Sequence, residues 1–385
     1  MSSVNINGYF KKDKIDTISK TFIFIQMMLG VNRLRVFDKV KFAYSVIVLI
    51  YCVCFSLIFA YLVLNNKSIL YVSYIIIVNV IAYFLNSILA FILSKKYRQF
   101  FDELNAFDTK VGLQYSICVS IILNVVACCI IIAIYCLANL YLYFNSFATE
   151  KSLYMSFKHI VFVVELFSYG HMMLLLLQRL QYIKRTAISC LARSITRRGN
   201  ANHREYEDTI EVEMRKLVLF YNDIIKAYDI LNALIKYQFV VLLLDSFFGN
   251  IFFWNLFAID FIAQKFNWWK RCIQTVIMFV TTLIPFFSPC YFGNQIKDEV
   301  SIIRDNIRSN IHKLGIFTFS FLIFFTDKNK RNAVKLLLSL TNIRTLSCSL
   351  FRMISVDILL PFKMLGYIAT YLIVIMQFEK ITGAN

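Results

Sequence analysis

Ionisable side chains inside an apolar stretch are the first candidates for chemistry in this chain. The window 152–178 is apolar but carries Lys158, His159, Glu165 and His171. Charged groups are costly in lipid, so residues of this kind often bind a ligand or an ion. Lys158 and Glu165 lie seven residues apart, which places them on one face of a helix about two turns apart. A ligand contact and a polar contact between helices are both consistent with this spacing.

Polar and aromatic side chains in other apolar windows could complete a binding pocket. Small-molecule pockets are mostly apolar and aromatic cavities with a few placed polar groups. Asp245 lies mid-window within 237–262, and Asp260 lies near the end of the same window. The candidate pocket residues are Tyr74, Asn79, Tyr135, Asn139, His159, Glu165, Asn250, Trp254 and Gln274. Each aromatic member also fits the role of an anchor at the membrane interface.

Catalytic and metal-binding signatures are missing from the sequence. The chain has no glycine-rich phosphate loop, no nucleophile elbow, and no cysteine and histidine pattern with metal-ligand spacing. Most of the ten cysteines lie in apolar windows, where cysteine behaves as a small hydrophobe. The sequence therefore predicts a protein that is not an enzyme and that uses no cofactor or metal.

Long apolar helices are the elements that must position these side chains. Hydrophobic residues make up 59% of the 385 residues and charged residues 17%, against about 45–50% and about 25% in soluble domains. A spanning helix needs roughly 20 consecutive apolar residues. The windows of this length are 42–64, 69–93, 115–144, 152–178, 237–262, 272–296 and 354–378. Each run is continuous rather than alternating, so the sequence predicts an all-α membrane protein with seven transmembrane helices.

The net charge of +18 is distributed unevenly along the chain. Of the 41 Lys and Arg residues, 33 fall in the segments 1–41, 94–114, 179–236 and 297–352. These segments share one side of a seven-helix topology, and the positive-inside rule makes that side cytoplasmic. We therefore expect the N-terminus in the cytoplasm and the C-terminus outside. Topology accounts for the charge, so we expect the lipid bilayer as a partner and no nucleic acid.

The loops divide the chain into segments. The predicted segments are 1–41 (cytoplasmic N-terminal segment), 42–178 (transmembrane helices 1–4), 179–236 (cytoplasmic extensions of helices 4 and 5), 237–296 (transmembrane helices 5 and 6), 297–352 (cytoplasmic, including the amphipathic first part of helix 7), 353–378 (transmembrane helix 7) and 379–385 (extracellular C-terminus). The apolar run 22–31 follows lysines, as in a signal peptide, but no small-residue cleavage site follows it. This favours a helix that lies on the inner membrane surface.

A heptad pattern runs through the longest basic segment. Ile210, Leu217, Ile224 and Leu231 recur every seven residues, and a second series, four residues out of phase, does the same. The members of that second series are Met214, Tyr221, Tyr228 and Ile235. These are the a and d positions of about four heptads. They predict a packed cytoplasmic helical bundle that joins subunits, and the alternative is an amphipathic helix on the inner leaflet.

The last apolar window ends in a specific pattern, Thr370-Tyr371-Leu372-Ile373-Val374-Ile375-Met376-Gln377-Phe378. A buried glutamine near the end of a spanning helix needs a polar partner or water. Gln377 could therefore line an aqueous pore. It could equally reach the outer interface, because the chain ends soon after it.

This ending resembles the signature of insect gustatory receptors, in which five apolar residues separate a Thr-Tyr pair from a Gln-Phe pair. Leu350-Phe351 and Val356-Asp357 before it also resemble that family. The resemblance implies a ligand-gated, nonselective cation channel in the plasma membrane of sensory neuron dendrites. It implies a homo- or hetero-tetramer with other gustatory receptor subunits, in which the cytoplasmic ends of helices four to seven form an anchor domain.

The same resemblance implies roles for particular residues. The last helix lines the pore, with Gln377 and Phe378 at the gate and Ile373 and Val374 beside them. The pocket for a small-molecule tastant lies in the outer parts of helices two to six, and cations pass through the pore. Leu372 stands where the sugar-receptor branch has a glutamate, which favours a bitter or other aversive ligand.

Lys363 in the pore helix departs from expectation, because a fixed positive charge repels cations at close range. We expect its side chain to point away from the pore axis or into a wide inner vestibule. Two alternative functions remain open. One is an insect odorant-receptor-type channel, which shares the architecture. The other is a G-protein-coupled receptor, which predicts an outside N-terminus and lacks support from the charge distribution.

Overall fold

The computed structural model describes most of the chain. The described ranges are 17–29, 70–112, 119–144, 150–196, 203–262, 268–316, 328–343, 346–351 and 353–382, with 31, 33, 46, 47, 49–51, 53, 54, 57 and 61 between the first two. Most of the first predicted transmembrane window, 42–64, lies outside these residues.

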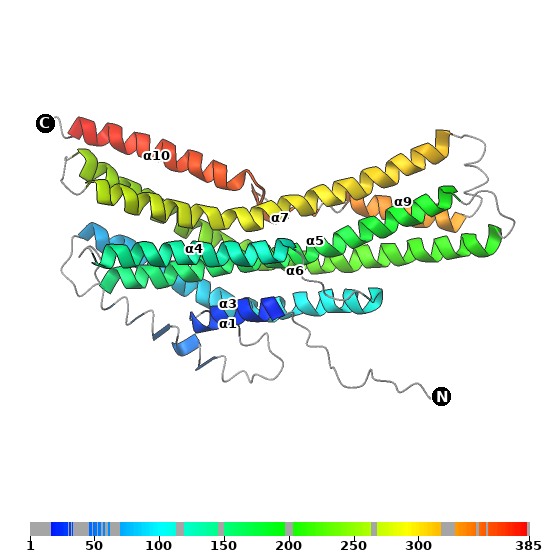
Figure 1. Ribbon diagram of the computed structural model, residues 1–385, viewed down its shortest axis with the longest axis horizontal. Helices are drawn as coiled ribbons and strands as arrows, with labels where there is room; N and C mark the ends of the chain where they lie inside the picture. Colours follow the sequence, from blue (N-terminus) through cyan, green and yellow to red (C-terminus); the bar gives the residue numbers. More distant parts are fainter. Residues whose placement is uncertain are drawn as a thin grey trace.

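Helices make up nearly all of the described structure. In chain order the elements are α1 (Thr17–Met28), α3 (Leu70–Val111), α4 (Val119–Phe144), α5 (Glu150–Thr196), α6 (His203–Ile262), α7 (Trp268–Ile316), α9 (Lys328–Ile343), β1 (Ser349–Leu350), β2 (Ile354–Ser355) and α10 (Leu360–Thr382). The longest helices, α5, α6 and α7, run along the length of the molecule, whereas α4 and α10 cover only one end of it (Figure 1).

Within the described residues, six helices are long and apolar enough to cross a membrane. Their candidate spans are Val80–Val111, Val119–Ala138, Lys158–Cys190, Val212–Ile259, Cys272–Ser309 and Leu360–Phe378. Each of these spans overlaps one of the second to seventh predicted windows, and four of them extend well beyond it, so the structure agrees with the helical class and with the order of these six elements.

Helix α5 forms the centre of the bundle. In its most apolar window, 94% of the residues are buried, against 28% for α4 and 22% for α10. It packs against α1, α4, α6 and α7. An all-round apolar sequence is what a helix surrounded by other helices requires.

Helix α6 is one continuous helix of 60 residues, as the absence of Pro and Gly between 200 and 248 predicts. The described side chains at the heptad positions are all buried within the chain: Met214, Leu217, Tyr221, Ile224, Tyr228, Leu231 and Ile235. The pattern therefore marks a packed helical bundle and not a helix on a bilayer surface. In the single chain this stripe packs against other helices of the same chain, and the predicted joining of subunits stays a prediction.

The described part of the N-terminal segment packs against the bundle, and its predicted cytoplasmic location stays a prediction. Helix α1 packs against α5, with Phe22, Ile23 and Gln26 buried. The Phe22 and His171 rings lie 5.8 Å apart. The apolar run needs a surface to cover its hydrophobic side chains, and α5 provides one inside the bundle.

A short hairpin leads into the last helix. Strands β1 and β2 are antiparallel, and Phe351 between them adopts a positive φ of 51°. Asp357 accepts a hydrogen bond from the Leu359 backbone N–H at 3.1 Å. Helix α10 then begins at Leu360 and not at 353 as predicted, because this turn and Pro361 in the first helical turn favour a start at that point.

Candidate functional site

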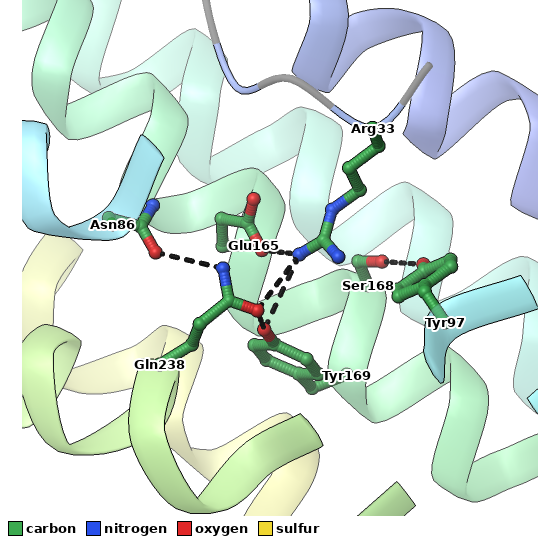
Figure 2. Close-up of polar contacts among 7 residues, drawn as sticks. All are labelled: Arg33, Asn86, Tyr97, Glu165, Ser168, Tyr169 and Gln238. Atoms are coloured by element: carbon green, nitrogen blue, oxygen red, sulfur yellow. Dashed lines mark hydrogen bonds and ion pairs between the residues drawn. The ribbon is translucent and has the colours of Figure 1, made fainter. Parts of the chain in front are cut away.

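Arg33 is the centre of a buried polar network (Figure 2). Its Nη2 donates to Glu165 Oε2 at 2.7 Å and to Gln238 Oε1 at 3.3 Å. The Arg33 and Glu165 side chains are both 0% exposed. The guanidinium carbon also lies 4.3 Å from the centroid of the Tyr97 ring, a cation–π distance.

Further hydrogen bonds extend this network across three helices. Tyr97 of α3 and Ser168 of α5 share a hydrogen bond of 2.8 Å. Tyr169 of α5 donates to Gln238 of α6, whose Nε2 donates to Asn86 of α3 at 3.2 Å. The segment after α1 is thereby joined to α3, α5 and α6 at one point in the interior, as Figure 2 shows.

Glu165 has a polar partner in this network, and its predicted place in a ligand pocket stays a prediction. Its carboxylate forms a polar contact inside the bundle, the second of the two roles considered for it. No sequence pattern marks Arg33 as a candidate, because this residue lies outside every apolar window. A useful signal was available, since an acid in the middle of a spanning helix needs a cation from elsewhere in the chain.

A second ion pair lies along the same helix. Lys158 Nζ of α5 donates to Asp245 Oδ1 of α6 at 2.5 Å, and the two side chains are 11% and 8% exposed. A cavity of about 30 Å³ adjoins this pair, lined also by Phe162, Gly249 and Met278. That space holds one or two water molecules, whereas pockets for small organic ligands measure about 300–1,000 Å³. A small organic molecule would fit here only after α5, α6 and α7 move apart locally.

Two of the predicted pocket residues line this cavity, and a third lies against one of them. His159 and Asn250 are lining residues. The Tyr135 ring of α4 lies 4.1 Å from the His159 ring, centroid to centroid. Asn250 Nδ2 donates to Thr282 Oγ1 of α7 at 2.8 Å. Aromatic and amide contacts beside the cavity therefore link α4 to α5 and α6 to α7.

The other predicted pocket residues are placed differently. Glu165 belongs to the Arg33 network. Trp254 packs against Phe279 at 6.0 Å between ring centroids, and neither it nor the half-buried Gln274 lines the cavity. The remaining candidates have side chains outside the described residues: Tyr74, Asn79 and Asn139.

Helices α5 and α7 approach each other closely at Gly170 and Ser288. A Cβ atom added at Gly170 would lie 1.9 Å from Ser288 Oγ and 3.1 Å from Ser288 Cβ. Ser288 in turn donates to Asn124 Oδ1 of α4 at 2.6 Å. A side chain larger than hydrogen at position 170 would separate the two helices or displace this hydrogen bond.

Helix α10 differs in burial along its length. Leu360, Met364 and Ile368 are buried against the rest of the chain. Beyond Ile368 no described residue of α10 is buried, and this exposed part carries the predicted motif and gate residues: Thr370, Tyr371, Ile373, Val374, Gln377 and Phe378. At the base of the helix, Cys348 Sγ contacts Asn232 Oδ1 at 3.4 Å, and burial raises the pKa of this thiol to about 12.

Comparisons with known proteins agree with these observations. The sequence profile of the family described as 7tm Chemosensory receptor matches residues 26–382. The fold is similar to that of the insect olfactory receptor OR5 from Machilis hrabei, with a TM-score of 0.58 at 12% identity, over 93% of this chain and 97% of that one. No curated protein sequence gives a significant match.

The profile spans all of the helices except the first part of α1 and includes both ion pairs and the closing motif. This confirms the prediction of a multi-pass membrane receptor that is not an enzyme. The chain belongs to the 7tm chemosensory receptor family.

Proposed function

We propose that the chain is the subunit of a ligand-gated, nonselective cation channel whose pore is lined by α10. The exposed second half of α10 is the observation that carries this proposal. Tyr371, Val374 and Phe378 are 46%, 40% and 65% exposed in the single chain. Gln377 is exposed beside them and needs water or a polar partner. Assembly of several copies around this half of α10 would supply both a packing surface and an aqueous path.

A taste receptor is the finer proposal. The Thr-Tyr and Gln-Phe pairs at 370–378 support it, and Leu372 supports a bitter or other aversive tastant over a sugar. An olfactory role is the second candidate, because the fold resembles an olfactory receptor. The two roles differ in ligand, so a panel of sugars, alkaloids, fatty acids and volatile compounds separates them.

Gating in this proposal begins at the cavity beside Lys158 and Asp245. A ligand must enlarge that small space, and the work of separating α5, α6 and α7 is transmitted along α6 and α7 to the helix they contact, α10. Binding energy can shift a conformational equilibrium only where the ligand contacts the two states differently. An expanded cavity provides such a difference.

The proposed location is the plasma membrane, with the N-terminus in the cytoplasm. The segments that hold most of the Lys and Arg residues support this orientation. An epitope placed at either terminus and stained with and without permeabilisation tests the orientation. Staining of an N-terminal tag on intact cells would contradict it.

The decisive experiment expresses the chain alone in a cell and records whole-cell current during application of the ligand panel. A ligand-evoked cation current that Gln377→Ala changes in permeability or amplitude would support the channel. Signalling that depends on a G protein and carries no current of its own would contradict it. If the chain reaches the surface without current, co-expression with other receptor subunits tests heteromeric assembly.

A further inference from the structure

A groove of about 380 Å³ lies between α6, the hairpin and α10, away from the cavity described above. Its walls are mostly apolar. Leu244 and Phe247 come from α6, Met353 from the hairpin, and Met364 and Tyr367 from α10. The groove has the size of a pocket for a small organic molecule, yet it opens at the surface of the chain. Met353 is 87% exposed.

One positive charge lies in this groove. Lys363 lines it and is exposed, and its side chain forms no ion pair with any residue that the structure describes. Asp357, the acid beside the start of α10, accepts hydrogen bonds from Ser355 Oγ at 2.6 Å and from the Leu359 N–H. A second cation lies near the hairpin, where Lys236 Nζ is 4.6 Å from the Phe351 ring centroid. The region is therefore apolar and cationic.

The level of the groove along α10 narrows the choice of ligand. Lys363 lies in the first turn of α10, at the end opposite the Gln377 motif. With the N-terminus in the cytoplasm, as proposed above, this end faces the inner leaflet. That leaflet carries anionic phospholipids, which attract basic residues at the membrane surface.

We propose that this groove binds an anionic phospholipid of the inner leaflet. Its phosphate pairs with Lys363, and one acyl chain lies along Leu244, Phe247 and Tyr367. The phosphate supplies a counter-charge for Lys363, whose positive charge in the proposed pore helix was unexpected. It also keeps the lysine at the α6 side of α10, where its charge is neutralised by the lipid and does not repel permeant cations.

A second copy of the chain is the competing occupant. It would bring the same apolar side chains but also the same lysine, and no carboxylate lines the groove to balance them. An anionic lipid matches both properties of the groove at once, because its chains are apolar and its headgroup is negative. Charge complementarity thus favours the lipid.

The full-length receptor is purified in mild detergent and reconstituted with equal amounts of phosphatidylserine and phosphatidylcholine. The amount of each lipid that the receptor retains is then measured. We expect Lys363→Gln to lower the retained phosphatidylserine about fivefold, the factor expected from loss of one basic residue at an anionic surface, and to leave phosphatidylcholine unchanged. Lys95→Gln is the matched control, since Lys95 is also exposed on a spanning helix and does not line the groove. Equal lipid retention by both variants would overturn the proposal.

A second variant tests the groove without changing its charge. Leu244 is 48% exposed, and Leu244→Trp fills part of the groove, whereas Leu219→Trp adds the same side chain elsewhere on α6. We expect only Leu244→Trp to lose phosphatidylserine.

A Met353→Cys variant tests whether a second copy of the chain occupies the groove. If it forms a disulfide-linked dimer at high yield, a second copy covers the groove and the lipid assignment is wrong. These readouts need no channel activity, so they stand apart from the proposed function.

Discussion

Helices α5 and α10 are both apolar, yet their polar residues lie in different surroundings. Helix α5 is surrounded by other helices, and its charged groups Lys158 and Glu165 each have a partner of opposite charge in the same chain. Helix α10 is packed on one side as far as Ile368, and Gln377 lies in its exposed second half. Charged residues on α5 therefore join helices within the chain, whereas Gln377 on α10 is exposed in the single chain.

The largest expected effect comes from breaking the ion pair of α5. Arg33→Met leaves Glu165 as an unpaired charge in the interior, which should destabilise the receptor by about 3–5 kcal/mol. We expect loss of the folded protein from the cell surface, measured by surface labelling and by thermal unfolding of the purified receptor. Arg98→Met is the control, because Arg98 is 35% exposed in its ion pair with Asp102.

The double variant Arg33→Met with Glu165→Leu sharpens this prediction. Removing both charges replaces a buried ion pair by apolar contacts, which is often neutral in stability. We therefore expect surface expression to recover in the double variant. If expression stays as low as in Arg33→Met alone, the ion pair is not the reason for the loss.

Glycine substitutions compare the packing of the two helices directly. Gly170→Ala on α5 forces a Cβ atom into Ser288 and should cost about 1–3 kcal/mol, as overpacking does. Gly366→Ala on α10 meets no atom within 4 Å and should stabilise its helix by about 0.5–1 kcal/mol. Thermal unfolding of both variants measures the contrast. A lower unfolding temperature for Gly366→Ala would show that its face of α10 is more crowded than in the single chain.

Removal of an amide from the cavity should affect the ligand response more than stability. Asn250→Ala removes an amide that lines the cavity and should raise the half-maximal ligand concentration about tenfold, the loss expected from about one hydrogen bond between this amide and the ligand. Asn222→Ala, an exposed position on the same helix, is the control. Concentration–response curves of the evoked current measure both. Equal curves would exclude this cavity as the ligand site.

The smallest effect concerns Cys348 at the base of α10. Burial raises its thiol pKa from 9.0 to about 12, so the folded state holds this proton more tightly than the unfolded state does. The stabilising contribution is present below pH 9 and is lost as the pH rises from 9 towards 12. The unfolding temperature should therefore fall less steeply above pH 9 in Cys348→Ala than in the unaltered receptor. Parallel curves would show that the thiol is open to solvent.

Sequence reasoning succeeded where one helix determines the outcome. Continuous apolar windows placed the spans, and the lack of Pro and Gly predicted the length of α6. It was less successful where two distant segments meet. Nothing near Arg33 marks it as the partner of Glu165, because the pairing depends on how the segment after α1 enters the bundle. The heptads of α6 indicated a packed face, but their spacing cannot say whether the partner helix belongs to the same chain.

Cysteine accessibility along α10 tests the proposed pore most directly. Ligand-evoked current is recorded from Gln377→Cys, Val374→Cys and Ile368→Cys channels before and after a charged, membrane-impermeant thiol reagent. Gln377 and Val374 lie in the exposed second half of α10, and Ile368 is 2% exposed. A pore lined by α10 predicts block at Gln377→Cys and Val374→Cys and none at Ile368→Cys. Current that is unchanged at all three positions, with surface expression intact, would contradict it.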